Sequence, residues 1–84
     1  MAKVTIYSKT YCPYCVRAKK LLENKGVPFE EIMVDSDPKL FADLKQKTGM
    51  MTVPQIFINE KLVGGYTELA GLEDRGELDS WLTD

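Results

Sequence analysis

The chain has 84 residues, enough for one domain and too few for two. Hydrophobic residues make up 44% of the chain and the net charge is −2, which is typical of a globular protein and not of a disordered one. Its lysines are scattered and no basic run alternates with aromatic residues, so no nucleic-acid partner is indicated. No stretch approaches the roughly 18 apolar residues of a membrane span, and the apolar part of residues 1–10 is too short for a signal-peptide core. We therefore expect a single domain over residues 1–84, a cytoplasmic location and no membrane contact.

The chain has two cysteines and no histidine, which limits the metal sites and disulfides that it can form. A structural zinc site takes four Cys or His ligands, so one chain cannot complete it, although two chains together could supply four thiolates. A structural disulfide between Cys12 and Cys15 would close a very short loop, for which the stabilisation is smallest, and such disulfides belong to oxidising compartments. We therefore expect no metal site within the chain, and reversible redox chemistry is the remaining use.

The first half of the chain alternates strand and helix patterns. Lys3–Tyr7 alternates and is rich in β-branched and aromatic residues, which predicts a strand. Pro13 suits the first position of a helix and makes Cys12 its N-cap, and Gly26 ends that helix. Phe29–Val34 is predicted as a second strand. Because a helix joins these two strands, we expect them to be parallel neighbours.

The middle of the chain adds a helix and a hairpin. Asp37 supplies an N-cap and Pro38 a first helical residue, and Gly49 ends the helix. Gln55–Asn59 is predicted as a third strand, joined by a tight turn to a fourth strand at Leu62–Gly64.

The end of the chain is predicted to form a helix with Thr67 as its N-cap. Gly76 ends this helix, and a final turn follows near Trp81. The predicted order is β-α-β-α-β-β-α. Such an order gives an α/β domain of three layers, with a small sheet between helices.

The sequence Cys-Pro-Tyr-Cys at a predicted helix start indicates a reactive site. The sulfur of Cys12 would face unpaired backbone N–H groups and the positive end of the helix dipole, both of which favour thiolate over thiol. Cys15 falls on the same helix face as Ala18 and Leu22, so it is predicted to be shielded. Residues three apart on a helix can bring their Cα atoms within disulfide range. A C-x-x-C motif beside a βαβ pattern is the known signature of thioredoxin-like redox proteins.

Four features in order extend this pattern along the chain: Lys9-Thr10-Tyr11-Cys12-Pro13-Tyr14-Cys15, Thr52-Val53-Pro54, Gln55-Ile56-Phe57-Ile58 and Gly64-Gly65-Tyr66-Thr67-Glu68-Leu69. Together they resemble a glutaredoxin of the dithiol class over essentially the whole length. The resemblance implies a thioredoxin fold, three-layer α/β/α with a four-stranded mixed sheet of order 2-1-3-4, and a cis peptide at Val53-Pro54. It also implies a glutathione-dependent thiol–disulfide oxidoreductase that reduces protein disulfides and glutathione mixed disulfides through Cys12 and Cys15.

The resemblance further implies a glutathione groove. Its expected contacts are Lys9, Tyr14, Gln46, Thr52, Val53, Pro54, Tyr66, Thr67 and Glu68. In the family, the backbone at Val53 pairs with the cysteinyl part of glutathione, and helix N–H groups near Thr67 hold the γ-glutamyl carboxylate. Glu68 would take the ammonium, while Lys9 and Gln46 would meet the glycyl carboxylate. By themselves these three residues also fit plainer roles, as two solvated polar residues and a first-turn acid.

The expected partners follow from the same resemblance. We expect a monomer with no bound cofactor, glutathione as co-substrate and reductant, and glutathione reductase acting indirectly. Disulfide-containing or glutathionylated proteins are the expected substrates, and ribonucleotide reductase is typical of the family. Two alternatives stay open: a thioredoxin-like protein recharged by thioredoxin reductase, and a carrier in which two chains bridge a [2Fe–2S] cluster through Cys12 and two glutathiones. The identity of the reductase that turns the protein over separates the first alternative, and visible absorbance after anaerobic reconstitution separates the second.

Overall fold

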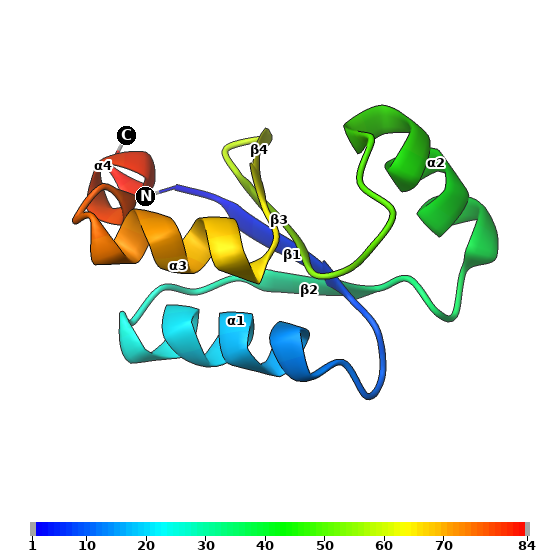
Figure 1. The fold of residues 1–84 in the computed structure, drawn as a ribbon, viewed down its shortest axis with the longest axis horizontal. Coiled ribbons are helices and arrows are strands. Elements are labelled where there is room, and N and C mark those ends of the chain that lie inside the picture. Colours follow the sequence, from blue (N-terminus) through cyan, green and yellow to red (C-terminus); the bar gives the residue numbers. More distant parts are fainter. Residues whose placement is uncertain (1, 84) are drawn as a thin grey trace.

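Four strands form one mixed sheet with helices on both of its faces (Figure 1). The computed structural model describes residues 2–83. The strands are β1 (Val4–Ser8), β2 (Glu30–Met33), β3 (Gln55–Ile58) and β4 (Lys61–Gly64). Their order is β2-β1-β3-β4, with β1 parallel to β2 and antiparallel to β3, and β3 antiparallel to β4. The predicted order and the parallel first pair are confirmed, and the fold is the thioredoxin fold.

The helices are α1 (Pro13–Asn24), α2 (Pro38–Thr48), α3 (Tyr66–Asp74) and α4 (Leu78–Leu82). Cys12 is the N-cap of α1, as predicted, and Asp37 caps α2 by accepting a hydrogen bond of 3.1 Å from the Leu40 N–H. Gly49 ends α2 in the left-handed conformation, which glycine adopts without steric penalty. Among residues 2–83 no helix is long and apolar enough to cross a membrane.

The core lies between one face of the sheet and helices α1, α3 and α4. Its buried side chains are Val4, Ile6, Ala18, Leu22, Ile56, Ile58, Leu69, Leu72 and Leu78. They fall at every second residue of a strand and every three to four residues of a helix, which are the periods that place side chains on one face. The other face meets α2, where the Thr48 hydroxyl bonds Gln55 and the Lys47 ammonium lies over the Phe57 ring.

Two details at the C-terminal end differ from the sequence expectation. Thr67 is not the cap of α3: the helix already begins at Tyr66, and Gly65 is its N-cap. The final turn is a short helix, α4, whose Leu78 is completely buried. The helix period was hard to recognise there because α4 covers only five residues.

An ion-pair cluster fixes α4 against the rest of the domain. The ammonium of Lys25, at the end of α1, lies 2.9 Å from Glu73 of α3 and 3.0 Å from Asp79 of α4. The hydrogen bonds that Lys25 donates to the Glu73 carboxylate and then to the Asp79 carboxylate raise the pKa of Lys25. One side chain therefore joins three helices at the end of the domain opposite to the start of α1.

We predict that Leu78→Ala lowers the free energy of unfolding by about 2–5 kcal/mol, because it removes a fully buried side chain and leaves a cavity. Urea denaturation of the reduced protein, followed by circular dichroism, measures this. Val16→Ala is the control, since Val16 is 51% exposed and its truncation is expected to change stability by less than about 0.5 kcal/mol. Equal losses in the two variants would contradict the place of α4 in the core.

Candidate active site

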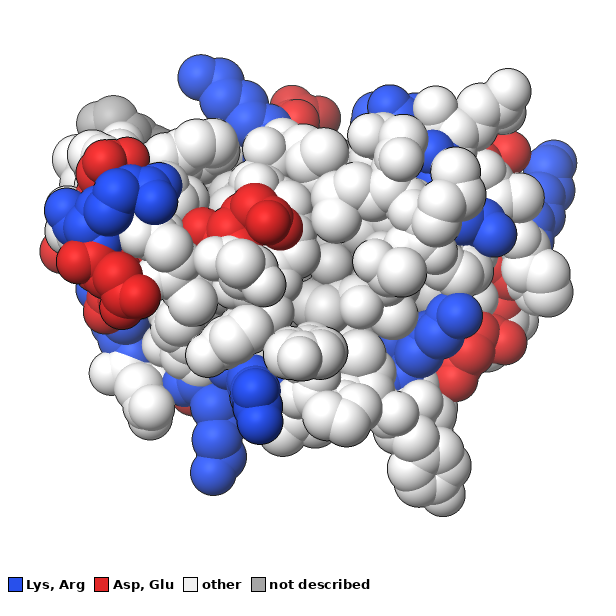
Figure 2. Space-filling model, in the orientation of Figure 1, with Lys and Arg blue, Asp and Glu red and all other residues white. Residues whose placement is uncertain are grey.

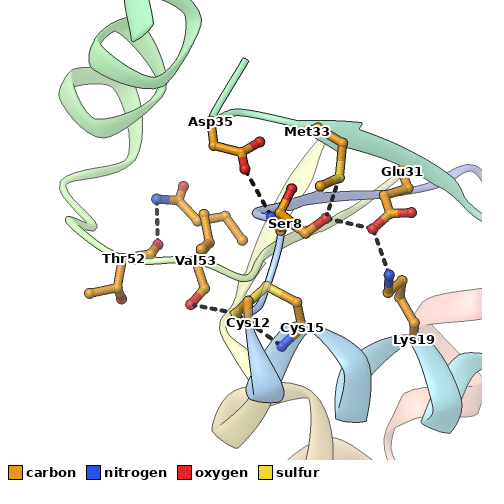
Figure 3. The surroundings of a disulfide bond; sticks show 11 residues. Ser8, Cys12, Cys15, Lys19, Glu31, Met33, Asp35, Thr52 and Val53 are labelled. Atoms are coloured by element: carbon orange, nitrogen blue, oxygen red, sulfur yellow. Dashed lines mark hydrogen bonds and ion pairs between the residues drawn. A yellow bond between two sulfur atoms is a disulfide. The ribbon is translucent and has the colours of Figure 1, made fainter. Parts of the chain in front are cut away.

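Cys12 and Cys15 lie at the start of α1 and are joined by a disulfide (Figure 3). Their Cα atoms are 5.1 Å apart, inside the range of roughly 4.4–6.8 Å that disulfides require. Cys15 is 1% exposed, whereas Cys12 is partly open to solvent. The pair therefore has one sulfur that a substrate can reach and one that is shielded, as the helix pattern predicts.

The start of α1 provides the electrostatic environment of Cys12. Its sulfur accepts a hydrogen bond of 3.2 Å from the backbone N–H of Cys15. The first turn of the helix contains no acidic residue that would oppose the helix dipole. Both features stabilise a negative charge on this sulfur once the disulfide is reduced.

A second segment approaches Cys12 from the sheet. The Val53-Pro54 peptide is cis, as the resemblance implies. The carbonyl oxygen of Val53 lies 3.9 Å from the sulfur of Cys12 (Figure 3). The loop before β3 is thereby placed directly against the reactive end of α1.

A pocket of about 170 Å³ lies between these two segments and the start of α3. Its lining residues are Tyr14, Met50, Thr52, Val53, Pro54, Gly65, Tyr66, Thr67 and Glu68. Seven of the nine residues expected to contact glutathione are in this lining. Met50 and Gly65 complete it and were not predicted as contacts. The rings of Tyr14 and Tyr66 stand 6.0 Å apart and form one wall.

The start of α3 offers backbone donors to this pocket. Gly65 has no side chain to cap the helix, so no side-chain cap bond reaches the first N–H groups, which have no acceptor within the helix. The Glu68 carboxylate accepts a 2.7 Å bond from the Gly65 N–H. Gly64 makes room for it: its φ is +127°, and a Cβ atom would lie 2.8 Å from the Glu68 side chain.

Comparison with known proteins decides the family. The glutaredoxin family model matches residues 4–63. The chain is 52% identical over 83 residues to a glutaredoxin of Pseudomonas aeruginosa, with 99% of both chains covered. It is 46% identical over 82 residues to glutaredoxin 3 of Escherichia coli, with 98% of this chain and 99% of that protein covered. This chain belongs to the glutaredoxin family.

The structural comparison agrees. The crystal structure of a buckwheat glutaredoxin–glutathione complex is similar, with a TM-score of 0.91 and 36% identity over 96% of this chain and 76% of that one. As a glutaredoxin with a Cys12–Cys15 pair, the chain is a glutathione-dependent dithiol oxidoreductase. Among residues 2–83 no group of three or more His, Cys, Asp or Glu side chains is placed to hold a metal ion.

Two of the expected glutathione contacts lie outside the pocket lining of this glutaredoxin. The ammonium of Lys9 is 4.5 Å from the centre of the Phe41 ring, and Gln46 is exposed on α2. The Lys45 ammonium lies at the same distance from that ring. The Lys9 ammonium therefore lies beside the first turn of α2.

Sequence reasoning missed Gln55, which fixes the loop of the active site. Gln55 is completely buried, and its amide donates bonds of 3.0 Å to the carbonyl oxygens of Met50 and Thr52. Its own oxygen accepts a 2.9 Å bond from Thr48. The sequence does show this polar residue between Pro54 and otherwise apolar strand residues. A buried amide at such a position needs hydrogen-bond partners nearby.

A second polar cluster that was not predicted links α1 to strands β1 and β2 (Figure 3). Ser8 is completely buried on β1, and its hydroxyl donates to the Glu31 carboxylate at 2.7 Å. The same carboxylate oxygen lies 2.7 Å from the ammonium of Lys19 on α1. The hydrogen bond from Lys19, followed by that from Ser8, lowers the pKa of Glu31.

We predict that Gln55→Leu raises KM for glutathione mixed disulfides and speeds amide hydrogen exchange at Thr52 and Val53. Two carbonyl groups lose their donor, and each buried unpaired group costs about 1–3 kcal/mol. Steady-state kinetics and exchange measurements test this. Thr48→Val is the graded comparison, because it leaves both Gln55 donors in place and is expected to have the smaller effect. Unchanged KM and exchange in Gln55→Leu would contradict the role.

We predict that the interaction between Lys19 and Glu31 stabilises the fold at neutral pH and disappears in acid. Because the folded pKa of Glu31 lies below its ordinary value of 4.5, the contribution is present above that value and is lost as pH falls through the folded pKa. Both side chains are about 30% exposed, so the coupling is expected to be below about 1 kcal/mol. A double-mutant cycle with Lys19→Gln and Glu31→Gln across this pH range measures it. A coupling that grows on acidification would contradict the assignment.

Proposed function

We propose that this glutaredoxin holds the glutathionyl half of a mixed disulfide in the pocket beside Cys12 and transfers it onto the Cys12 sulfur. The supporting observation is the position of the pocket. Val53 lines the pocket, and its carbonyl oxygen lies 3.9 Å from the sulfur of Cys12. A tripeptide thiol lying in the pocket would therefore present its sulfur to the one cysteine that solvent reaches.

The proposed contacts use the groups that the pocket presents. The Val53 backbone pairs with the cysteinyl part of glutathione, as exposed backbone edges do with extended peptides. The N–H groups of Tyr66 and Thr67 hold the γ-glutamyl carboxylate, since helix N-termini bind anions. The second oxygen of Glu68 receives the ammonium while the first stays on Gly65. The Tyr14 ring covers the peptide.

The glycyl carboxylate extends toward α2 in this proposal, where Lys9 and Gln46 meet it. A lysine ammonium over an aromatic ring keeps its charge and its remaining hydrogen-bond donors. Lys9 therefore stays able to pair with an anion while its stem packs on Phe41.

The reaction balances as two thiol–disulfide exchanges. The Cys12 thiolate attacks the glutathione sulfur of the mixed disulfide, and the substrate leaves as a thiolate that takes a proton from water. A second glutathione thiolate then attacks the glutathione sulfur on Cys12, which releases glutathione disulfide and restores the Cys12 thiolate. For a protein disulfide, the Cys12 thiolate attacks one substrate sulfur and the other leaves as a thiolate. Cys15 then attacks the Cys12 sulfur, which releases the second substrate thiolate and forms the Cys12–Cys15 disulfide seen here. Two glutathione molecules then reduce this disulfide.

A lowered cysteine pKa serves the release step in this scheme. A drop of three units raises the thiolate fraction at neutral pH about 30-fold but reduces nucleophilicity about 20-fold. Attack by Cys12 gains little from this, whereas its departure from a mixed disulfide gains substantially, because low-pKa thiols leave faster. The site is suited to forming and resolving transient disulfides.

The proposed partners and cellular compartment follow from the use of glutathione as the reductant. Glutathione disulfide must be returned to glutathione, which glutathione reductase does with NADPH, so that enzyme is an indirect partner. The proposed substrates are glutathionylated and disulfide-containing proteins, with ribonucleotide reductase as a family-typical example. We place the protein in the cytoplasm, where the glutathione pool is kept reduced.

We predict that Cys12→Ser abolishes the NADPH-coupled reduction of a glutathionylated peptide by glutathione and glutathione reductase. Cys15→Ser is expected to keep this activity and to lose most of its activity on a protein disulfide, because only the latter needs the second thiol. Absorbance of NADPH measures both reactions. If the wild type is inactive with glutathione but turns over with thioredoxin reductase, the proposed pocket is wrong.

A further inference from the structure

The large hydrophobic side chains that are exposed gather around the reactive cysteine. Within residues 2–83 they are Tyr11, Tyr14, Val16 and Met51. The first three lie in or next to the Cys-Pro-Tyr-Cys motif, and Met51 lies two residues before Val53. Exposed apolar groups that cluster in this way mark interaction surfaces. Figure 2 shows a face with a broad, largely uncharged centre, around which both basic and acidic side chains lie.

Tyr11 is the clearest case, because the fold makes no use of its side chain. It is 98% exposed, and its backbone has a φ of +59°, which is rare for residues other than glycine. Strain of this kind tends to persist at functional positions. The backbone here holds an aromatic ring in solvent directly beside Cys12.

A groove along α1 adds two positively charged side chains, Arg17 and Lys20, to this surface. It has a volume of about 380 Å³ and is lined by Arg17, Lys20, Leu21, Asn24 and Tyr66. Tyr66 also lines the pocket that we assign to glutathione, so the two hollows adjoin. Lysine and arginine side chains project over α1 in Figure 2.

The two cations of the groove are available for a partner. Lys19 is paired with Glu31 and Lys25 with Glu73 and Asp79, whereas neither Arg17 nor Lys20 has an ion pair within the part of the chain that the structure describes. The Arg17 guanidinium lies only over the Tyr14 ring, at 5.4 Å. In a chain of net charge −2, this is a local basic site next to the active cysteine.

We propose that protein substrates dock on this surface, formed by Tyr11, Arg17 and Lys20, through an extended segment that carries acidic residues near its target cysteine. The proposal rests on the proposed function, since the pocket takes the glutathionyl half and the protein half must lie outside it. Along α1, Arg17 is about 8 Å and Lys20 about 12 Å from Cys12. An extended segment covers these spans in about two and four residues. The preferred substrate therefore has Asp or Glu two and four residues from its cysteine.

The test compares glutathionylated peptides that differ only at those positions, with Glu, Gln or Lys on both sides of the cysteine. For the wild type, kcat/KM is expected to fall in the order Glu, Gln, Lys and the preference to weaken as salt is raised. Arg17→Gln/Lys20→Gln is expected to lower kcat/KM for the Glu peptide about three- to tenfold, as exposed ion pairs do, and to leave the Gln peptide nearly unchanged. Lys39→Gln/Lys61→Gln is the control with the same change of charge, since both lysines are exposed and distant in sequence from the motif. An equal Glu-to-Gln ratio in wild type and Arg17→Gln/Lys20→Gln would overturn the proposal.

Tyr11→Asn tests the apolar part, because asparagine tolerates a positive φ and the variant is expected to fold. It is expected to lower kcat/KM for all three peptides alike, and an unchanged value would contradict this part. The mixed disulfide of glutathione and 2-mercaptoethanol carries no substrate peptide, so its reduction depends on the glutathione pocket and not on the docking surface. All variants are expected to reduce it at the wild-type rate. A wild type that cannot reduce it would refute the proposed function itself, whereas full activity without peptide preference would refute only the docking surface.

Discussion

The site depends on the placement of one sulfur at a helix N-terminus. Cys12 caps α1, and the N–H of Cys15 donates to its sulfur at 3.2 Å, so the group that caps the helix is also the reacting atom. A cap is normally a hydroxyl or carboxylate oxygen that satisfies unpaired N–H groups. With a thiolate in this position, stabilising the helix and stabilising the leaving group are the same interaction. The buried Cys15 one turn further on can then only exchange with Cys12.

The sheet and its buried polar groups keep this sulfur in register with its substrate pocket. Cys12 follows β1 after the short segment 9–11, and the neighbouring strand β3 begins after the cis Val53-Pro54 peptide, so the central strands bring the two segments together. Gln55 holds the loop before that peptide through two backbone carbonyl groups. On the other side, the Glu31 carboxylate accepts a hydrogen bond from Ser8 and pairs with Lys19 of α1. Because Gln55 is completely buried and its hydrogen bonds are satisfied, the loop before the cis peptide has few alternative arrangements.

The strands, helices α1 and α2 and the reactive pair could be predicted from local rules. Pro13, Asp37 and Gly49 fix helix ends by their own stereochemistry, and the exposed and buried roles of the two cysteines follow from helix periodicity. The strand order and the cis peptide needed the family resemblance, because pairing between distant strands is not set by local sequence. Ser8 and Gln55 were missed because their partners lie 23 residues away or in an irregular loop. The start of α3 was misplaced because a glycine cap has no side chain to recognise.

The chemistry proposed for Cys12 requires that the start of α1 stabilises its thiolate. The most direct measurement is the rate of alkylation by iodoacetamide against pH in the Cys15→Ser variant, where Cys12 is the only thiol. We expect a titration midpoint well below the value of about 8.5 for a free cysteine, and a higher midpoint when the helix start is disrupted by Pro13→Gly. A midpoint at or above the free-cysteine value would show that the helix start does not stabilise the thiolate. The scheme in which Cys12 acts as the leaving group would then lose its physical basis.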